Sequence, residues 1–200
     1  NVLIFYLLKK QRGLMRKTLI IVLFVIFPLL ASTPVMAQQL RVGIQLGSPI
    51  PTDNWTNYAS AGFGGMGTLS YEIHSKIAFT AALGYYFFGS SDKNYLAKYG
   101  DYDFSVIPIV GGLRYSFLNN PGKISPYIGS EFGIYIHHHT FESEYYGYTS
   151  STRFTKLGIS PMAGMKYNIN RNMDFDFNMK YTIIDGFSNF GINAGISLGL

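Results

Sequence analysis

The sequence predicts an all-β protein, an eight-stranded antiparallel transmembrane β-barrel preceded by a cleavable signal peptide. Two observations predict the barrel. From residue 39 onward, apolar residues alternate with other residues at a period of two in eight successive segments, which is the pattern of β-strands rather than of helices. The connections between these segments alternate between short turns and longer polar loops, as they do in barrels that span a membrane.

The signal peptide is predicted for residues 1–37. Residues 15–17 are Met-Arg-Lys, residues 19–30 form an apolar run, and residues 35–37 are Val-Met-Ala. This order of basic, apolar and small-residue segments is typical of a secretory signal, so we expect cleavage before Gln38. A transmembrane anchor is the alternative, but the run is shorter than the roughly 20 residues that a spanning helix needs. The residues before Met15 are interpreted as lying upstream of the true translation start.

The charge of the chain belongs mostly to this segment. Five of the 16 basic residues and none of the 11 acidic residues lie in residues 1–37. Residues 38–200, the predicted barrel domain, therefore carry eleven of each and a formal net charge of zero. A nucleic-acid-binding protein would need a basic face, so no nucleic acid is expected as a partner. Cysteine is absent, which excludes disulfides and thiolate metal sites.

Eight strands are expected, most of them longer than the five or six residues of an average strand. They are placed at residues 39–47, 59–73, 77–89, 103–117, 126–140, 153–169, 173–184 and 189–200. Segments of this length match the roughly 9–11 residues with which a tilted strand crosses a bilayer. The short turns are residues 74–76, 118–123 and 170–172, and the longer set is 48–58, 90–102 and 141–152 with a shorter fourth at 185–188.

The two faces of each strand differ in chemistry. In the seventh segment Phe175, Phe177 and Met179 alternate with Asp174 and Asp176. In a soluble sandwich, the main alternative, the apolar face would form the core. The opposite faces here mix glycine with few charges, and Tyr71, Tyr115, Phe117 and Tyr167 gather near the short turns, which favours a barrel with its apolar face in lipid. Pro108 and Pro161 fall inside strands, where we expect bulges or bends because proline donates no hydrogen bond.

Several motifs resemble those of a known family. They are Gly-Tyr-Tyr-Phe-Phe at residues 84–88, Ile-Pro-Ile-Val-Gly-Gly-Leu-Arg-Tyr-Ser-Phe at 107–117, Pro-Tyr-Ile-Gly-Ser-Glu-Phe-Gly-Ile-Tyr at 126–135, Ala-Gly-Met-Lys-Tyr-Asn-Ile at 163–169 and the glycine-alternating last strand. In order and spacing they resemble the outer membrane protein β-barrel domain family of small eight-stranded OmpX-, OmpA- and PorT-like barrels. The resemblance implies a location in the outer membrane of a Gram-negative bacterium. The sequence departs from the family at its last residue, Leu200, where family members often have an aromatic residue.

Nine charged residues are expected to line the barrel interior as a paired network. They are Arg41, Glu72, Arg114, Glu131, Lys156, Lys166, Asp174, Asp176 and Lys180. The alternative role is an ion or proton path. An eight-stranded barrel is only wide enough for side chains to fill, and an unpaired buried charge is costly. Both facts favour the structural role.

A histidine run is the sharpest local motif. His137 and His139 share one strand face and are followed by Glu142 and Glu144, a set of ligand types that a metal ion accepts. A polar strand end is the simpler interpretation, so no metal, cofactor or catalytic residue is assigned. A lipid A hydrolase or acyltransferase, with His137 or His139, Ser143 and a glutamate at the outer rim, stays open as an alternative.

The expected function is that of a non-enzymatic outer-membrane barrel with a structural or surface-interaction role, while a PorT-like subunit of secretion or envelope machinery remains the other alternative. Aromatic residues in the loops, among them Trp55, Tyr58, Tyr145, Tyr146 and Tyr148, suit contacts with a surface protein or glycan. Packing over the barrel mouth explains them equally well. The expected partners are outer-membrane lipid, lipopolysaccharide and the assembly machinery, and a monomer is expected.

Overall fold

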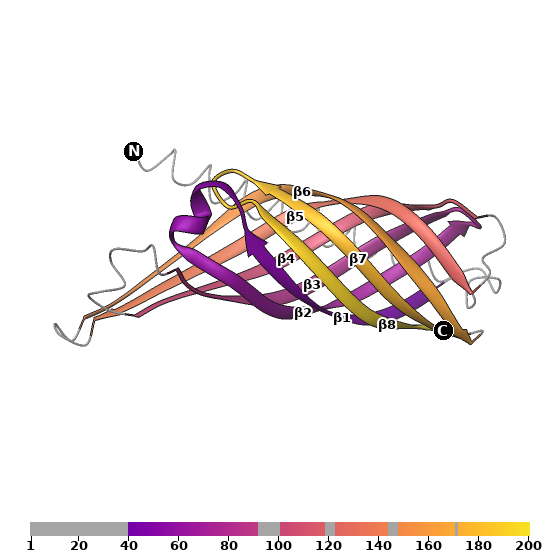
Figure 1. Cartoon of the computed structure of the whole chain (residues 1–200), viewed down its shortest axis with the longest axis horizontal. Coiled ribbons are helices and arrows are strands. Elements are labelled where there is room, and N and C mark those ends of the chain that lie inside the picture. Colours follow the sequence, from indigo (N-terminus) through magenta and orange to yellow (C-terminus); the bar gives the residue numbers. More distant parts are fainter. Residues whose placement is uncertain (1–39, 92–100, 119–122, 144–147, 171) are drawn as a thin grey trace, which may run out of the picture. The chain divides into compact units, whose positions relative to one another are not determined.

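The computed structural model describes residues 40–91, 101–118, 123–143, 148–170 and 172–200, which form eight antiparallel strands in one closed ring (Figure 1). The strands are β1 (Leu40–Pro51), β2 (Ala59–His74), β3 (Ile77–Ser90), β4 (Asp101–Ser116), β5 (Ile124–Ser143), β6 (Tyr148–Asn170), β7 (Met173–Ile184) and β8 (Asn189–Gly199). A short 3-10 helix, η2 (Asp53–Asn57), follows β1. The predicted signal peptide lies outside the described residues. Within them, no helix is long and apolar enough to cross a membrane.

The predicted barrel is confirmed, and the main differences lie at the long-loop end. β1 continues to Pro51 instead of ending at residue 47, so residues 48–51 of the expected first loop are strand, and most of the rest is η2. β5 and β6 continue to Ser143 and from Tyr148, so most of the expected third loop is a β-hairpin. Figure 1 shows β4, β5 and β6 reaching further than the other strands at this end of the barrel.

The stagger of the strands sets the width of the barrel. Pairing can be followed once around the ring through Gly164, Asn178, Asn193, Gly47, Gly64, Tyr86, Val106, His137 and Phe154. The path returns to β6 ten residues from where it began, which is a shear number of ten. Strand number, shear and tilt are linked, so the strands are tilted by about 35–45° and the lumen holds little more than side chains.

The two faces of the barrel wall have opposite chemistry. The outward positions carry exposed large apolar side chains on every strand, among them Ile44, Leu83, Ile109, Phe132 and Ile159. Tyr115, Phe117 and Tyr167 also face outward near the short turns, where an interfacial aromatic girdle is expected. Buried polar and charged residues occupy the inward positions. This arrangement, apolar outside and polar inside, is the one expected of a barrel in lipid and the reverse of a soluble sandwich.

Bulges or bends were expected at Pro108 and Pro161, and the strand pairing shows no bulge at either proline. Pairing between β3 and β4 keeps one register from Leu83–Ile109 to Tyr86–Val106, on either side of Pro108. The same is true between β6 and β7 on either side of Pro161. Each proline leaves a local gap in one ladder because it lacks the N–H that would fill it. The register shifts lie elsewhere, next to the ends of β2 and of β6.

Glycines on the inward face make room for large lumenal side chains. A Cβ atom on Gly164 would lie 2.6 Å from Tyr127 Cζ, and one on Gly158 would lie 2.7 Å from Tyr135 Cε2. Both tyrosine rings therefore rest where a neighbouring strand has no side chain. Small and large residues alternate in this way to fill narrow barrels.

A charge placed on the outward face should be costly in proportion to its depth in the bilayer. Phe132 lies in the middle of the outward apolar row of β5 and is 58 % exposed. We expect Phe132→Arg to lower the free energy of unfolding in lipid vesicles by about 2–4 kcal/mol, whereas Thr155→Arg, on the outward face near the rim, should cost about 0–1 kcal/mol. Urea unfolding measures both. Equal and small costs at the two sites would show that Phe132 faces water.

Candidate functional site

The lumen near the short turns is occupied by a first layer of ion pairs. Arg41 Nη1 lies 2.6 Å from Asp174 Oδ2, and Arg41 Nε lies 3.4 Å from Glu72 Oε1. Lys166 Nζ reaches the same Glu72 oxygen at 3.5 Å. These four side chains come from β1, β2, β6 and β7, so the layer ties together opposite sides of the barrel.

A second layer lies deeper in the barrel and is centred on Asp176. Arg114 Nη1 donates to Asp176 Oδ2 at 2.9 Å, and the Tyr127 hydroxyl donates to Asp176 Oδ1 at 2.7 Å. The Arg114 guanidinium also lies over the Tyr127 ring, 4.2 Å from its centroid. Asn178 donates to Asp176 Oδ1 at 3.1 Å. The buried carboxylate therefore has a charged partner and neutral donors, which is the condition under which a buried ion pair is tolerated.

A third layer joins the remaining lumenal charges. Lys180 Nζ lies 3.2 Å from Glu131 Oε2, and both side chains are about nine-tenths buried. Beside this pair, Asn193 donates to Asn178 Oδ1 at 3.0 Å and accepts a hydrogen bond from the Tyr86 hydroxyl at 3.2 Å. We call the three layers together the lumenal charge network; its charged members are Arg41, Glu72, Arg114, Glu131, Lys166, Asp174, Asp176 and Lys180.

Lys156, the ninth residue of the expected network, lies apart from the other eight. Its ammonium group pairs with Asp185 Oδ2 at 2.7 Å, and the Asp185 side chain is exposed in the turn between β7 and β8. The hydrogen bond from Lys156 lowers the pKa of the Asp185 carboxyl. The neutral partners Tyr127, Asn178 and Asn193 were not expected as members of the network. Tyr127 shares the inward parity of Glu131 on β5 and Asn178 that of Asp174 and Asp176 on β7, and Asn193 lies on the polar face expected of the last strand.

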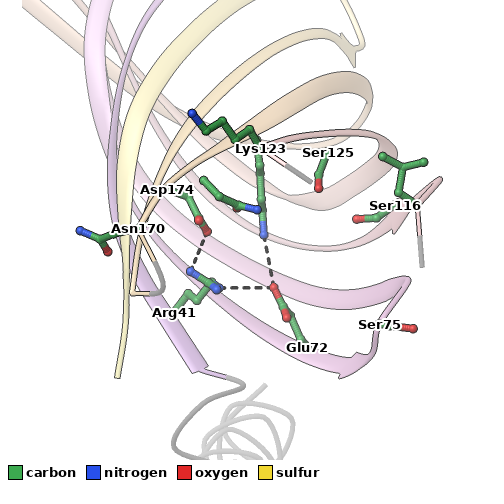
Figure 2. Close-up of a pocket in the computed structure, with 11 residues that line it drawn as sticks. Arg41, Glu72, Ser75, Ser116, Lys123, Ser125, Asn170 and Asp174 are labelled. Atoms are coloured by element: carbon green, nitrogen blue, oxygen red, sulfur yellow. Dashed lines mark ion pairs between the residues drawn. The ribbon is translucent and has the colours of Figure 1, made fainter. Parts of the chain in front are cut away.

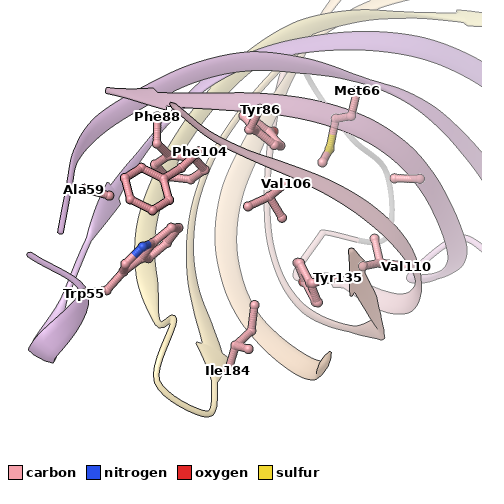
Figure 3. Close-up of a cluster of buried hydrophobic side chains, with 11 residues drawn as sticks. Trp55, Ala59, Met66, Tyr86, Phe88, Phe104, Val106, Val110, Tyr135 and Ile184 are labelled. Atoms are coloured by element: carbon pink, nitrogen blue, oxygen red, sulfur yellow. The ribbon is translucent and has the colours of Figure 1, made fainter. Parts of the chain in front are cut away.

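Toward the long-loop end the lumen becomes apolar. A cluster of buried side chains, the apolar plug, points into the barrel (Figure 3). Its members are Trp55, Ala59, Met66, Ala82, Tyr86, Phe88, Phe104, Val106, Val110, Tyr135 and Ile184. Trp55, which was expected to be exposed or to pack over the mouth, is only 2 % exposed. It is carried inward by η2, and its ring lies 4.5 Å from that of Phe88 and 5.6 Å from that of Phe187. Tyr58 is exposed.

The two inward histidines sit beside the plug. The His137 ring stacks on Phe154 at 5.1 Å and is 1 % exposed, while the His139 ring lies 6.3 Å from it. Glu144 and the Glu142 side chain lie outside the described residues, so the four-residue ligand set, to which no metal was assigned, lies only partly within them. Among the side chains that the structure describes, no group of three or more histidines and carboxylates could hold a metal ion.

The third layer of the network allows a test of how the lumenal charges are coupled. Lys180→Met should lower the free energy of unfolding by about 3–5 kcal/mol, because it leaves Glu131 buried and unpaired. Adding Glu131→Gln should restore most of that loss. Lys156→Met removes the same charge from a pair whose carboxylate is exposed and should cost about 0–1 kcal/mol. Equal costs for the two lysine variants in urea unfolding would contradict a sealed network.

Comparisons with known proteins agree with this geometry. A comparison with curated proteins finds no match. Among solved structures, Ail of Yersinia pestis is similar over 80 % of this chain and 97 % of its own, with a TM-score of 0.58 and 15 % identity. Neisserial surface protein A is similar over 80 % of this chain and 97 % of its own, with a TM-score of 0.56 and 18 % identity. OprG of Pseudomonas aeruginosa is similar over 82 % of this chain and 93 % of its own, with a TM-score of 0.55 and 12 % identity.

The family itself is shown by a match along the sequence. The model of the outer membrane protein β-barrel domain matches residues 23–199, which is most of the chain. The likeness to the solved structures adds the fold, because each of the three aligns with about four fifths of this chain and with nearly all of its own length. The chain belongs to the outer membrane protein β-barrel domain family and is a β-barrel of the Gram-negative outer membrane.

Proposed function

We propose that the protein is a non-enzymatic barrel with a filled lumen that presents a projecting β-hairpin for contacts outside the cell. The observation that carries this proposal is the continuation of β5 and β6 beyond the ring of strands. The two strands stay paired from Ile124–Tyr167 to Ser143–Tyr148. Pairing of β6 with β7, on its other side, begins only at Gly158–Ile184. The edge of β6 from Tyr148 to Leu157 therefore has no partner strand within the described chain.

The direction in which the backbone N–H groups point on this edge follows from one hydrogen bond and one gap in the strand pairing. The Asn168 amide donates to the Lys123 carbonyl at the start of β5, so even-numbered N–H groups of β6 point toward β5. Odd-numbered groups point to the other side, where Pro161 leaves its gap in the β7 ladder. The N–H groups of Thr149, Ser151, Arg153 and Thr155 thus face outward on the free edge. Such an edge is a template on which another polypeptide can add a strand.

The filled lumen supports a contact role over that of a pore. The lumenal charge network and the apolar plug occupy the barrel from the first layer of ion pairs to the long-loop end. Among Gln45, Thr68, Arg114, Glu131 and Asp176 lies an internal cavity of about 20 Å³, room for about one water molecule. A barrel filled in this way acts through its surfaces.

The surfaces suggest three kinds of partner. The outward apolar band fits outer-membrane lipid and lipopolysaccharide, and insertion of such a barrel implies the assembly machinery. The hairpin suits a surface protein or a glycan. Ail, one of the similar structures, has been solved with the heparin analogue sucrose octasulfate, which makes that molecule a useful first glycan probe. The barrel is proposed to act as a monomer.

Changing the hairpin should remove binding without changing the barrel. Cells that display the chain should retain at least one component of an array of immobilised polypeptides and glycans, including sucrose octasulfate. Thr155→Pro removes one N–H from the free edge of β6 and should weaken binding of a strand-adding partner by about tenfold, the loss of one hydrogen bond. Thr155→Ala keeps that N–H and serves as the matched control. Binding that is absent, or equal in both variants, would contradict the proposal.

A second candidate function rests on one contact. His138 lies between the two inward histidines and faces outward, and its Nε2 atom lies 2.6 Å from Ser151 Oγ. A histidine this close can take the proton of a serine that attacks an ester, and this pair sits just beyond the outward apolar residues Ile136 and Leu157. The site would then be a lipid-modifying one, built on His138 and Ser151 instead of on His137, His139 and Ser143.

Lipid A mass spectra separate the two functions. If the enzyme alternative holds, cells that produce the chain will show a changed lipid A mass, and both His138→Ala and Ser151→Ala will abolish the change. His74→Ala is the control, because His74 Nδ1 also lies near a serine hydroxyl, that of Ser75 at 3.3 Å, but at the opposite end of the barrel. We expect unchanged spectra in all cases, as a non-enzymatic barrel requires.

A further inference from the structure

The short-turn end of the barrel holds a cavity that the proposed function does not use. It has a volume of about 390 Å³ and lies above the first layer of ion pairs (Figure 2). We call it the vestibule; its lining residues include Arg41, Glu72, Lys123, Ser125, Lys166 and Asp174. Short turns face the periplasm in outer-membrane barrels, so the vestibule is open to periplasmic solutes.

The lining of the vestibule selects hydrophilic ligands. Ten of its eleven residues are polar or charged, and Leu118 is the single apolar one. Ligand sites for apolar molecules are instead lined mainly by hydrophobic side chains. Three cations, Arg41, Lys123 and Lys166, face two carboxylates, Glu72 and Asp174, so one positive charge is in excess. A ligand with a net negative charge would balance it.

Apart from Arg41 Nε and Nη1, which face Glu72 and Asp174 as ion pairs, two buried polar atoms in the lining have no hydrogen-bond partner within the described chain. They are Ser125 Oγ and Asp174 Oδ1, on side chains that are 4 % and 2 % exposed as residues. A buried polar group left unpaired is costly, and each such group calls for an explanation such as a bound molecule. Asp174 Oδ1 can only accept a hydrogen bond when ionised, whereas Ser125 can accept or donate. The ligand must therefore carry a donor as well as an acidic group.

We propose that the vestibule binds a small acidic zwitterion, of the class of an acidic amino acid or the acidic end of a short peptide. Its carboxylate meets Lys166, Lys123 and the Ser125 hydroxyl, and its ammonium group meets Asp174 and Glu72. The two carboxylates of the lining disfavour a phosphate dianion, which carries two negative charges and offers them at most one O–H donor. The ion pairs of Arg41 with Asp174 and Glu72 hold the floor of the site in place.

The experiment is an NMR titration of the purified full-length chain in detergent micelles with L-glutamate, succinate and inorganic phosphate. Glutamate should saturably shift the amide signals of Ser125, Lys166 and Asn168. Trp55, the single tryptophan, lies in the apolar plug and gives an indole signal that should not move. Lys166→Met should weaken the binding of glutamate by about tenfold, because one charge-assisted hydrogen bond is lost. Lys123→Met, in an exposed turn position, should weaken it without risk to the fold.

Lys156→Met removes the same charge at the other end of the barrel and should leave glutamate binding unchanged. Saturable shifts with glutamate alone, which need a higher glutamate concentration in Lys166→Met and Lys123→Met, support the proposal. Succinate binding as tightly as glutamate would overturn it, because the ammonium group would then contribute nothing. Binding of phosphate in preference to glutamate, or no saturable shift with any probe, would overturn it as well.

Discussion

The closure of eight strands into one hydrogen-bonded ring is the constraint on which the rest of this structure depends. Within a bilayer every backbone N–H and C=O group needs a protein partner, because no water is present to take its place. The ring supplies those partners, and β1 pairs with β8 as regularly as with β2. Closure with a stagger of ten residues also fixes a narrow bore, so the inward side chains have to fill a space of set width.

How the bore is filled explains why the barrel has two unlike halves. Near the short turns the inward positions carry charges, and each carboxylate of the lumenal charge network lies close to a cation from another strand. Toward the long-loop end the same positions carry the apolar plug, which η2 completes by placing Trp55 in the mouth. One half therefore keeps a vestibule lined with charge, and the other half is filled mainly by apolar side chains. The surface available for large partners is the hairpin of β5 and β6.

The strands and the direction of most side chains could be predicted from the sequence, because a period of two fixes which residues share a face. Once Asp174 and Asp176 face the lumen, Phe175 and Phe177 have to face lipid, and β7 was predicted at its observed bounds. Pairing partners could not be predicted in the same way. Lys166 meets Glu72 across the barrel only because of the stagger, which depends on all eight registers together. The same holds for Lys156, which the stagger leaves beside Asp185 at the rim.

The effect of the prolines and the structure of the loops were harder to predict, for a different reason. The sequence shows that Pro108 and Pro161 each lack a backbone N–H. It does not show whether the missing donor causes a bulge or only a gap in one ladder of hydrogen bonds. Trp55 is flanked by polar residues typical of a loop, and only the inward path of η2 shows that it is buried. Ser151 gains its place beside His138 from cross-strand pairing of the hairpin, at residues where polar composition alone predicted a loop.

The central claim, that the apolar face of each strand touches acyl chains while its other face is sealed inside, is tested most directly at two neighbouring residues of β3. Ala82 faces the lumen and is 7 % exposed, whereas Leu83 faces outward and is 58 % exposed. The chain has no cysteine, so Ala82→Cys and Leu83→Cys each give a unique site for a spin label in lipid vesicles. We predict that molecular oxygen, which concentrates in the bilayer, will reach the label at residue 83 far more readily than the label at residue 82. Equal access at both residues, or better access of a water-soluble nickel complex than of oxygen at residue 83, would contradict the account.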